Sequence, residues 1–258
     1  MMRLSREVRF NIVDVEDYVS KVTNSWSGSP STHMLVPRLS LITTVQGMPD
    51  ERRGYICNIK LIDDLIRDVI EREVIPVFKP DTSPELILRH IYSNSLRSWA
   101  DPSVLIHEQS LVLSPYLKFT INSEEVSMVS LTQQFEFSAS HRLHNPELSD
   151  EENRELFGKC NNPNGHGHNY VVEISLKRAL AARKLYLPAF EAKVKELVID
   201  RLDHKHLNVD VDYFKEVNPS VENIAIAIWE WLDGQFGDDQ LSNVRVYETP
   251  KTWADYCG

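Results

Sequence analysis

The sequence is poor in the features that mark several large classes of protein. It has only three cysteines in 258 residues, Cys57, Cys160 and Cys257, and this odd number of widely spaced thiols argues against a disulfide framework. No run of about 18 apolar residues occurs, and the first 20 residues lack an apolar segment followed by small residues. We therefore predict a cytoplasmic protein with no membrane span and no secretion signal.

Positive charge and linker sequence are also scarce. The 28 lysines and arginines are outnumbered by 38 aspartates and glutamates, for a net charge of -10. Because a nucleic-acid backbone requires a basic surface, we do not expect a nucleic-acid partner. A small anion needs only a local cluster of cations and is not excluded. No Gly/Ser-rich or Pro-rich linker separates domains, although 42% hydrophobic residues are enough for a substantial core.

The sequence does contain an internal repeat in its apolar pattern. In the second half, periodicity predicts the order strand, strand, helix, helix, strand, at residues 133–143, 168–177, 188–202, 220–236 and 243–249. The first half predicts the same order, at residues 7–13, 37–47, 61–74, 83–96 and 110–121. Two copies of one α+β unit, joined near residue 128, explain both. The alternative is that any α+β chain shows such a similarity between its halves without being a repeat.

A candidate metal site lies in the second half, within "GKCNNPNGHGHNY". On an extended segment the side chains of His166 and His168 point the same way, and Gly165 and Gly167 leave room for a close approach. Catalytic zinc keeps three protein ligands and one open position. His141, on the apolar face of its predicted strand, is the candidate third ligand. The alternative is a polar loop without a metal.

Four further residues are candidates for acid–base chemistry or binding. Cys160 is either a fourth ligand of a closed structural site or a reactive thiol. Asp203 and His204 form either a proton relay that holds this thiol as thiolate, or a solvated helix end. Glu248, at the end of the last predicted strand, is either solvent-facing or positioned to accept paired hydrogen bonds from an amidine-like edge such as that of a pterin.

The first half lacks these groups. Its histidines, His33, His90 and His107, have spacings that suit no ligand set, and Cys57 lies in the apolar stretch "GYICNIKLI", where a buried structural thiol is expected. Matching the two halves by pattern places Ser114 at the position of Glu248. We therefore expect the chemistry in the second half.

Five segments, "FSASHRL", "GKCNNPNGHGHNY", "LDHKHLN", "ENIAIAIW" and "VYET", together resemble the 6-pyruvoyltetrahydropterin synthase family over roughly residues 131–258. The resemblance implies the tunnelling fold, an antiparallel four-stranded sheet with two helices on one face, in units that assemble as a β-barrel oligomer. Residues 129–258 would be the catalytic unit, and residues 1–128 a degenerate unit without catalytic residues.

The resemblance also implies a substrate and roles for nine residues. The substrate would be 7,8-dihydroneopterin triphosphate, converted to 6-pyruvoyltetrahydropterin with loss of triphosphate. The Zn2+ ligands would be His141, His166 and His168. The base and its relay would be Cys160, Asp203 and His204. The pterin anchor would be Glu248, with Ser220 and Glu222 near the same ring.

Two other functions agree with the same residues. One is a 6-carboxytetrahydropterin synthase of queuosine biosynthesis, although the five residues between Cys160 and His166 resemble the spacing of the animal pyruvoyl enzymes. The other is a protein that binds a pterin or purine without turning it over. The resemblance implies a homo-oligomer with active sites between subunits. It leaves the triphosphate contacts open, with Arg142, Lys159, Lys205 and Lys251 as flanking cations. The segment "ARKLYLPAF" departs from the family pattern, and we expect a rebuilt pocket wall there.

Overall fold

The structure is a computed structural model in which residues 1–12, 37–79, 81–182 and 185–258 are described. It divides into two compact units, the first formed by residues 1–131 and 178–183 and the second by residues 132–177 and 184–258. His33 and two residues of "ARKLYLPAF", Arg183 and Lys184, lie outside the described residues. None of the described helices has the length and apolar character needed to cross a membrane.

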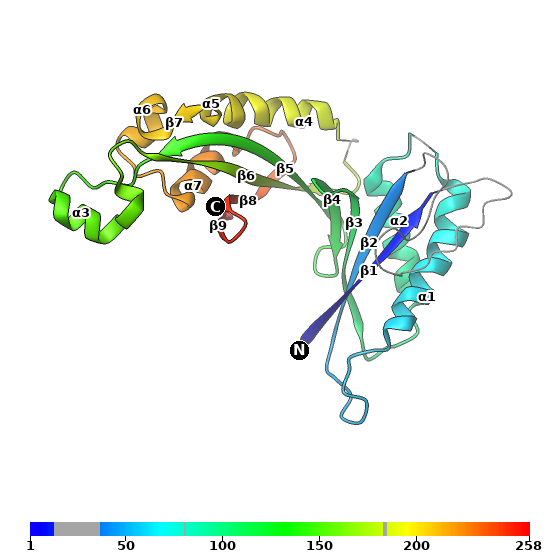
Figure 1. Ribbon diagram of the computed structural model, residues 1–258. Coiled ribbons are helices and arrows are strands. Elements are labelled where there is room, and N and C mark those ends of the chain that lie inside the picture. Colours follow the sequence, from blue (N-terminus) through cyan, green and yellow to red (C-terminus); the bar gives the residue numbers. More distant parts are fainter. Residues whose placement is uncertain (13–36, 80, 183–184) are drawn as a thin grey trace. The chain divides into compact units, whose positions relative to one another are not determined.

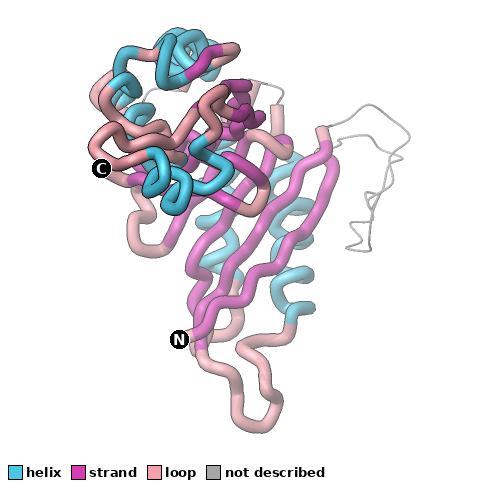
Figure 2. The backbone as a smooth tube through the Cα atoms, turned by 60° about the vertical axis from the view of Figure 1, so that its left-hand side comes forward, coloured by secondary structure: helices cyan, strands magenta, loops and turns pink. Residues whose placement is uncertain are grey.

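The first unit is an antiparallel four-stranded sheet with helices on one face (Figures 1 and 2). The strand order is β1–β2–β3–β4. The bounds are β1 Met2–Asn11, β2 Arg38–Gly47, α1 Ile59–Val69, a π-helix Ile70–Val74, a 3-10 helix Ile75–Val77, α2 Pro84–Ser98, β3 Leu105–Ser114 and β4 Leu117–Asn122. The single strand predicted over 110–121 is wrong, because Pro115 cannot donate to a ladder and the chain turns there into the β3–β4 hairpin.

Alternating apolar side chains build the core of this unit. Val8 and Phe10 of β1 are fully buried, as are Ile62 and Ile66 of α1. The helix starts are fixed by local caps; the Asn58 side chain accepts a hydrogen bond from the Lys60 amide at the start of α1. Cys57 is buried, as predicted for a structural thiol.

The second unit repeats this plan with additional short elements (Figure 1). Its strand order is β5–β6–β8–β9, and β7 pairs in parallel with the end of β5. The strands are β5 Met128–His141, β6 His166–Ala179, β7 Lys205–His206, β8 Gln240–Thr249 and β9 Thr252–Tyr256. The helices are α3 Asp150–Phe157, a 3-10 helix Gly158–Asn161, α4 Leu187–Val194, a π-helix Lys195–Ile199, α5 Asp200–Leu202, α6 Leu207–Asp210, a 3-10 helix Asp212–Lys215 and α7 Val221–Leu232.

The two units share irregularities as well as element order. In the β3–β4 hairpin the register skips one residue, Leu113, two positions before the turn, and in β8–β9 it skips Glu248 at the same place. The pairing of β2 with β3 skips His107, and that of β6 with β8 skips Ser242. A β-bulge interrupts a ladder at a specific point, so matching bulges support a tandem repeat. They also correct the pattern alignment, because Leu113, and not Ser114, stands at the position of Glu248.

Candidate active site

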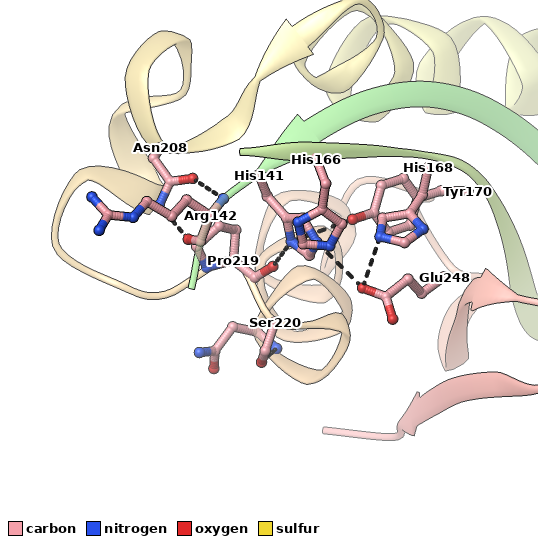
Figure 3. Close-up of polar contacts among 10 residues, drawn as sticks. His141, Arg142, His166, His168, Tyr170, Asn208, Pro219, Ser220 and Glu248 are labelled. Carbon is pink, nitrogen blue, oxygen red and sulfur yellow. Dashed lines mark hydrogen bonds and ion pairs between the residues drawn. The ribbon is translucent and has the colours of Figure 1, made fainter. Parts of the chain in front are cut away.

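Three histidines and a glutamate converge inside the second unit (Figure 3). His141 ends β5, His166 and His168 begin β6, and Glu248 lies at the bulge of β8. One ligand atom from each residue lies within 4.8 Å of every other. The Nε2 atoms of His141 and His166 are 3.1 Å apart, and the Glu248 Oε1 atom lies 3.3 Å from His141 Nε2 and 3.4 Å from His168 Nε2.

His141 is held in one orientation by the loop before α7. Its ring is fully buried, and its Nδ1 atom lies 2.6 Å from the Pro219 carbonyl oxygen. The Ser220 hydroxyl accepts a hydrogen bond from the Asn223 amide and caps α7 beside this carbonyl. With the proton on Nδ1 donated to Pro219, the Nε2 lone pair faces the cluster. A histidine ligand oriented in this way by a backbone carbonyl is typical of protein metal sites.

Burial also sets the protonation of this cluster. Removal from water lowers the pKa of His141 to about 4, and the neighbouring His166 and His168 add to the effect. Burial likewise lowers the pKa of His168. The charge of Glu248 raises this pKa by a smaller amount, and His166 lowers it further. His141 and His168 are therefore neutral at pH 7, which is the form that binds a metal ion.

The residues present fit a zinc ion. The buried Nε2 atom of His168 has no hydrogen-bond partner among the described residues, and it faces the other ligand atoms. Nitrogens bonded to tetrahedral zinc at about 2.0–2.1 Å lie roughly 3.3 Å apart, close to the 3.1 Å between His141 and His166. Three imidazoles form a donor set that zinc prefers, and a catalytic zinc with three protein ligands would leave one position for water or substrate.

Gly165 makes the close approach of the β5 and β6 ends possible. Its φ is +70°, and an added Cβ atom would lie 2.9 Å from both the His141 carbonyl oxygen and His206 Nε2. The prediction that Gly167 is needed for the same reason is wrong, since an added Cβ there would meet nothing closer than 3.5 Å.

Tyr170 and Cys160 lie near the cluster. Tyr170 is fully buried, and its hydroxyl lies 3.4 Å from His141 Nδ1. Burial raises the pKa of this hydroxyl, with further contributions from the charges of Glu248 and Cys160. Cys160 is held near the end of β5 by a hydrogen bond of 2.8 Å that its carbonyl oxygen accepts from the Leu143 amide. It lies in the 3-10 helix after α3 and is partly exposed.

Asp203 and His204 form a pair on the surface. The Asp203 Oδ2 atom lies 2.8 Å from His204 Nδ1, and its Oδ1 atom accepts a hydrogen bond from the Ser138 amide at 2.8 Å. The Ser138 bond and then His204 lower the pKa of Asp203. His204 has a positive φ of 57° and a side chain that is 84% exposed. Within the described part of the chain, no hydrogen bond or ion pair joins this pair to Cys160.

The remaining predicted pterin contacts lie at the start of α7. Ser220 is its N-cap, and Glu222 is an exposed residue in its first turn. The structure brings Glu248 together with the three histidines of the same chain.

Sequence reasoning missed a set of asparagines that fix the loops around the site. Asn208 accepts a hydrogen bond from the Arg142 amide at 2.8 Å and donates one to the Arg142 carbonyl at 2.9 Å (Figure 3). Buried Asn161 donates to the Leu143 carbonyl at 2.7 Å. Asparagines with fixed backbone contacts are common in loops. The repeated asparagines in "NNPNGHGHNY" are a signal for Asn161, whereas no local signal marks Asn208.

The half of the chain that contains this site is similar to known proteins. Residues 130–258 match the family model "6-pyruvoyl tetrahydropterin synthase". A Drosophila melanogaster 6-pyruvoyl tetrahydrobiopterin synthase is 43% identical over 132 residues, which are 50% of this chain and 79% of that protein. The Homo sapiens protein of that name is 42% identical over 50% of this chain and 90% of its own length. The structure of Caenorhabditis elegans 6-pyruvoyl tetrahydropterin synthase aligns with 51% of this chain and 96% of its own, at 39% identity and a TM-score of 0.47.

Proposed function

This chain belongs to the 6-pyruvoyl tetrahydropterin synthase family through residues 130–258, and on that premise we propose that its second unit is a zinc-dependent 6-pyruvoyltetrahydropterin synthase. The substrate would be 7,8-dihydroneopterin triphosphate, and the reaction a carbon–oxygen lyase step that releases triphosphate. The observation that carries the proposal is the convergence of three imidazoles and a carboxylate within 4.8 Å.

The three histidines would form the metal site. His141, His166 and His168 would hold zinc, with His141 oriented by the Pro219 carbonyl. Zinc there would supply a Lewis acid for an oxygen of the substrate side chain. The buried walls around His141 and Tyr170 exclude water from this side of the cluster and strengthen its electrostatic interactions.

Cys160 would move protons at the side-chain carbons. A thiol is useful as a base only as thiolate, which a nearby cation stabilises. His204 is the proposed partner, held by Asp203 at 2.8 Å. Because His204 is 84% exposed and makes no contact with Cys160 of its own chain among the described residues, we propose that it reaches Cys160 of a neighbouring chain in a homo-oligomer.

Glu248 would bind the pterin ring. A carboxylate accepts two parallel hydrogen bonds from a 2-amino-4-oxo edge. The bulge in β8 aims Glu248 at the histidines, so a ring held there would place its side chain next to the metal ligands. Ser220 and Glu222 would lie near the same ring at the start of α7.

The first unit would have a structural role. Its counterpart of Glu248 is Leu113, so it lacks the proposed anchor. We propose that it is a catalytically silent tunnelling-fold copy, and that sheets of several units close into a barrel. Closure would pair the edge strands and remove exposed sheet edges.

The test is product analysis by mass spectrometry after zinc-loaded protein is incubated with 7,8-dihydroneopterin triphosphate. We expect 6-pyruvoyltetrahydropterin from the wild type and from Cys257→Ala, which removes a free, exposed thiol outside the predicted site. Cys160→Ala should lose at least about a hundredfold in rate, as expected for a missing proton-transfer group.

Other outcomes would redirect the proposal. Formation of 6-carboxytetrahydropterin and acetaldehyde would place the protein with the queuosine enzymes. Binding of the pterin without any product, in protein shown to contain zinc, would identify a non-catalytic binding protein. Equal rates for Cys160→Ala and Cys257→Ala would refute the role of Cys160.

A further inference from the structure

A cavity of about 650 Å³ borders the metal cluster in the second unit. Its wall includes His166, whose Nε2 atom belongs to the cluster, and Gly158, Lys159 and Asn161, which flank Cys160 on both sides. A ligand in this cavity would therefore lie beside both a metal ligand and the segment that carries the thiol.

The charges around this cavity are mainly positive. Three cations line it, Arg142, Arg154 and Lys159, against one carboxylate, Asp150. None of the ion pairs formed by the described residues includes any of these three cations. Unpaired cations gathered around one cavity are unusual in a chain with a net charge of -10, and they favour an anionic ligand.

Arg142 is held by side-chain contacts, and the backbones of Arg154 and Lys159 lie in helices. Asn208 binds the Arg142 backbone from both sides, and Arg142 Nε donates to the Asn161 carbonyl at 3.2 Å. This leaves other N–H groups of the guanidinium available to a ligand. Arg154 lies in the last turn of α3, whose start is fixed by a reciprocal capping box. Lys159 follows in the adjoining 3-10 helix.

We propose that this cavity binds the triphosphate of the substrate, an inference that rests on the proposed function. The triphosphate is attached to the same short side chain whose oxygens would face the metal cluster, so its site must adjoin that cluster. In the elimination, the base takes a proton from the adjacent carbon, the carbon–oxygen bond breaks, and its electron pair leaves with the triphosphate oxygen. Arg142, Arg154 and Lys159 would stabilise the charge on this leaving group.

Of the four flanking cations considered from the sequence, only Arg142 and Lys159 line this cavity. Lys205 lines a different cavity, with His204 and His206. Arg154, which sequence reasoning did not select, takes its place beside Arg142 and Lys159. The proposal therefore specifies which charges bind the phosphates.

The experiment is isothermal titration of the full-length, zinc-loaded protein with inorganic tripolyphosphate. Because tripolyphosphate chelates zinc, the titration is repeated on metal-free protein, whose heats contain no contribution from zinc extraction. The variants are Arg154→Gln, Lys159→Gln and their combination, with Arg154→Lys as a conservative variant that keeps the charge. The matched control is Lys195→Gln, which removes one exposed charge from the π-helix after α4. Circular dichroism and thermal melts confirm folding of each.

We expect the double variant to weaken tripolyphosphate binding at least about tenfold, since charge-assisted hydrogen bonds to phosphate are lost. Arg154→Lys should remain within about threefold of wild type, and Lys195→Gln should not differ from it. Equal affinities for wild type and double variant, or no binding by wild type, would overturn the assignment of the cavity. The titration requires no turnover, so the two proposals can fail separately. If the wild type forms no product but the variants weaken tripolyphosphate binding as expected, only the proposed function is refuted. If the wild type forms product but binds tripolyphosphate no more tightly than the double variant, only the assignment of the cavity is refuted.

Discussion

Acidification should destabilise the metal-free protein through His141. In the folded chain the pKa of this buried ring is about 4, whereas an unfolded histidine titrates near about 6.5. The unfolded state therefore binds a proton first as the pH falls, so stability is full above about 6.5 and is lost progressively toward pH 4. Between pH 7 and pH 5 this single group should lower the free energy of unfolding of the second unit by about 2 kcal/mol.

The measurement is urea denaturation of EDTA-treated protein at half-unit intervals from pH 7 to pH 5, followed by tryptophan fluorescence. His141→Gln removes the titrating ring and should flatten the pH dependence by about 2 kcal/mol, although it also lowers stability at pH 7. Saturating zinc should raise stability at pH 7, because the ion binds only the folded arrangement of ligands. If wild type and His141→Gln show the same slope, the burial of a neutral His141 is refuted.

Two further predictions concern backbone strain and a buried charge. Gly165→Ala should cost roughly 1–3 kcal/mol in unfolding free energy, because alanine at a φ of +70° is strained and its Cβ atom would lie 2.9 Å from the His141 carbonyl oxygen. Gly167→Ala is the matched control and should cost less than about 1 kcal/mol; equal losses in denaturant melts would contradict this account. Arg178→Ala should destabilise the first unit by about 3–5 kcal/mol, because Glu85, 3.2 Å from the guanidinium, would lose a buried partner. A loss below about 1 kcal/mol would show that this ion pair is dispensable.

The sequence predicted the elements whose signals are local and repetitive. Alternation of Phe137, Ala139 and His141 predicted β5, and the two histidines at the start of β6 predicted the candidate metal site because a strand places alternate side chains on one face. The repeat was visible for the same reason, since both units use the same succession of periods. Family resemblance added proposed roles for residues whose own spacing carries little information.

Features that depend on distant contacts were not predictable. The Pro219 carbonyl orients His141 from 78 positions away along the chain. Asn208 reaches the Arg142 backbone in the same way, across 66 positions. The turn at Pro115 was overlooked because the apolar residues on either side continue one pattern. Helix α3 was missed because its eight residues are mostly charged and bury only Asn153, so they lack an apolar stripe.

The paired bulges at Leu113 and Glu248 separate the shape of the hairpin from its chemistry. Both units deform the strand at the same point, yet only one places a carboxylate there. The deformation is therefore a property of the scaffold that a side chain can use or leave unused. Because the bulge does not depend on the side chain it carries, one substitution there can change the chemistry of a unit without changing its fold.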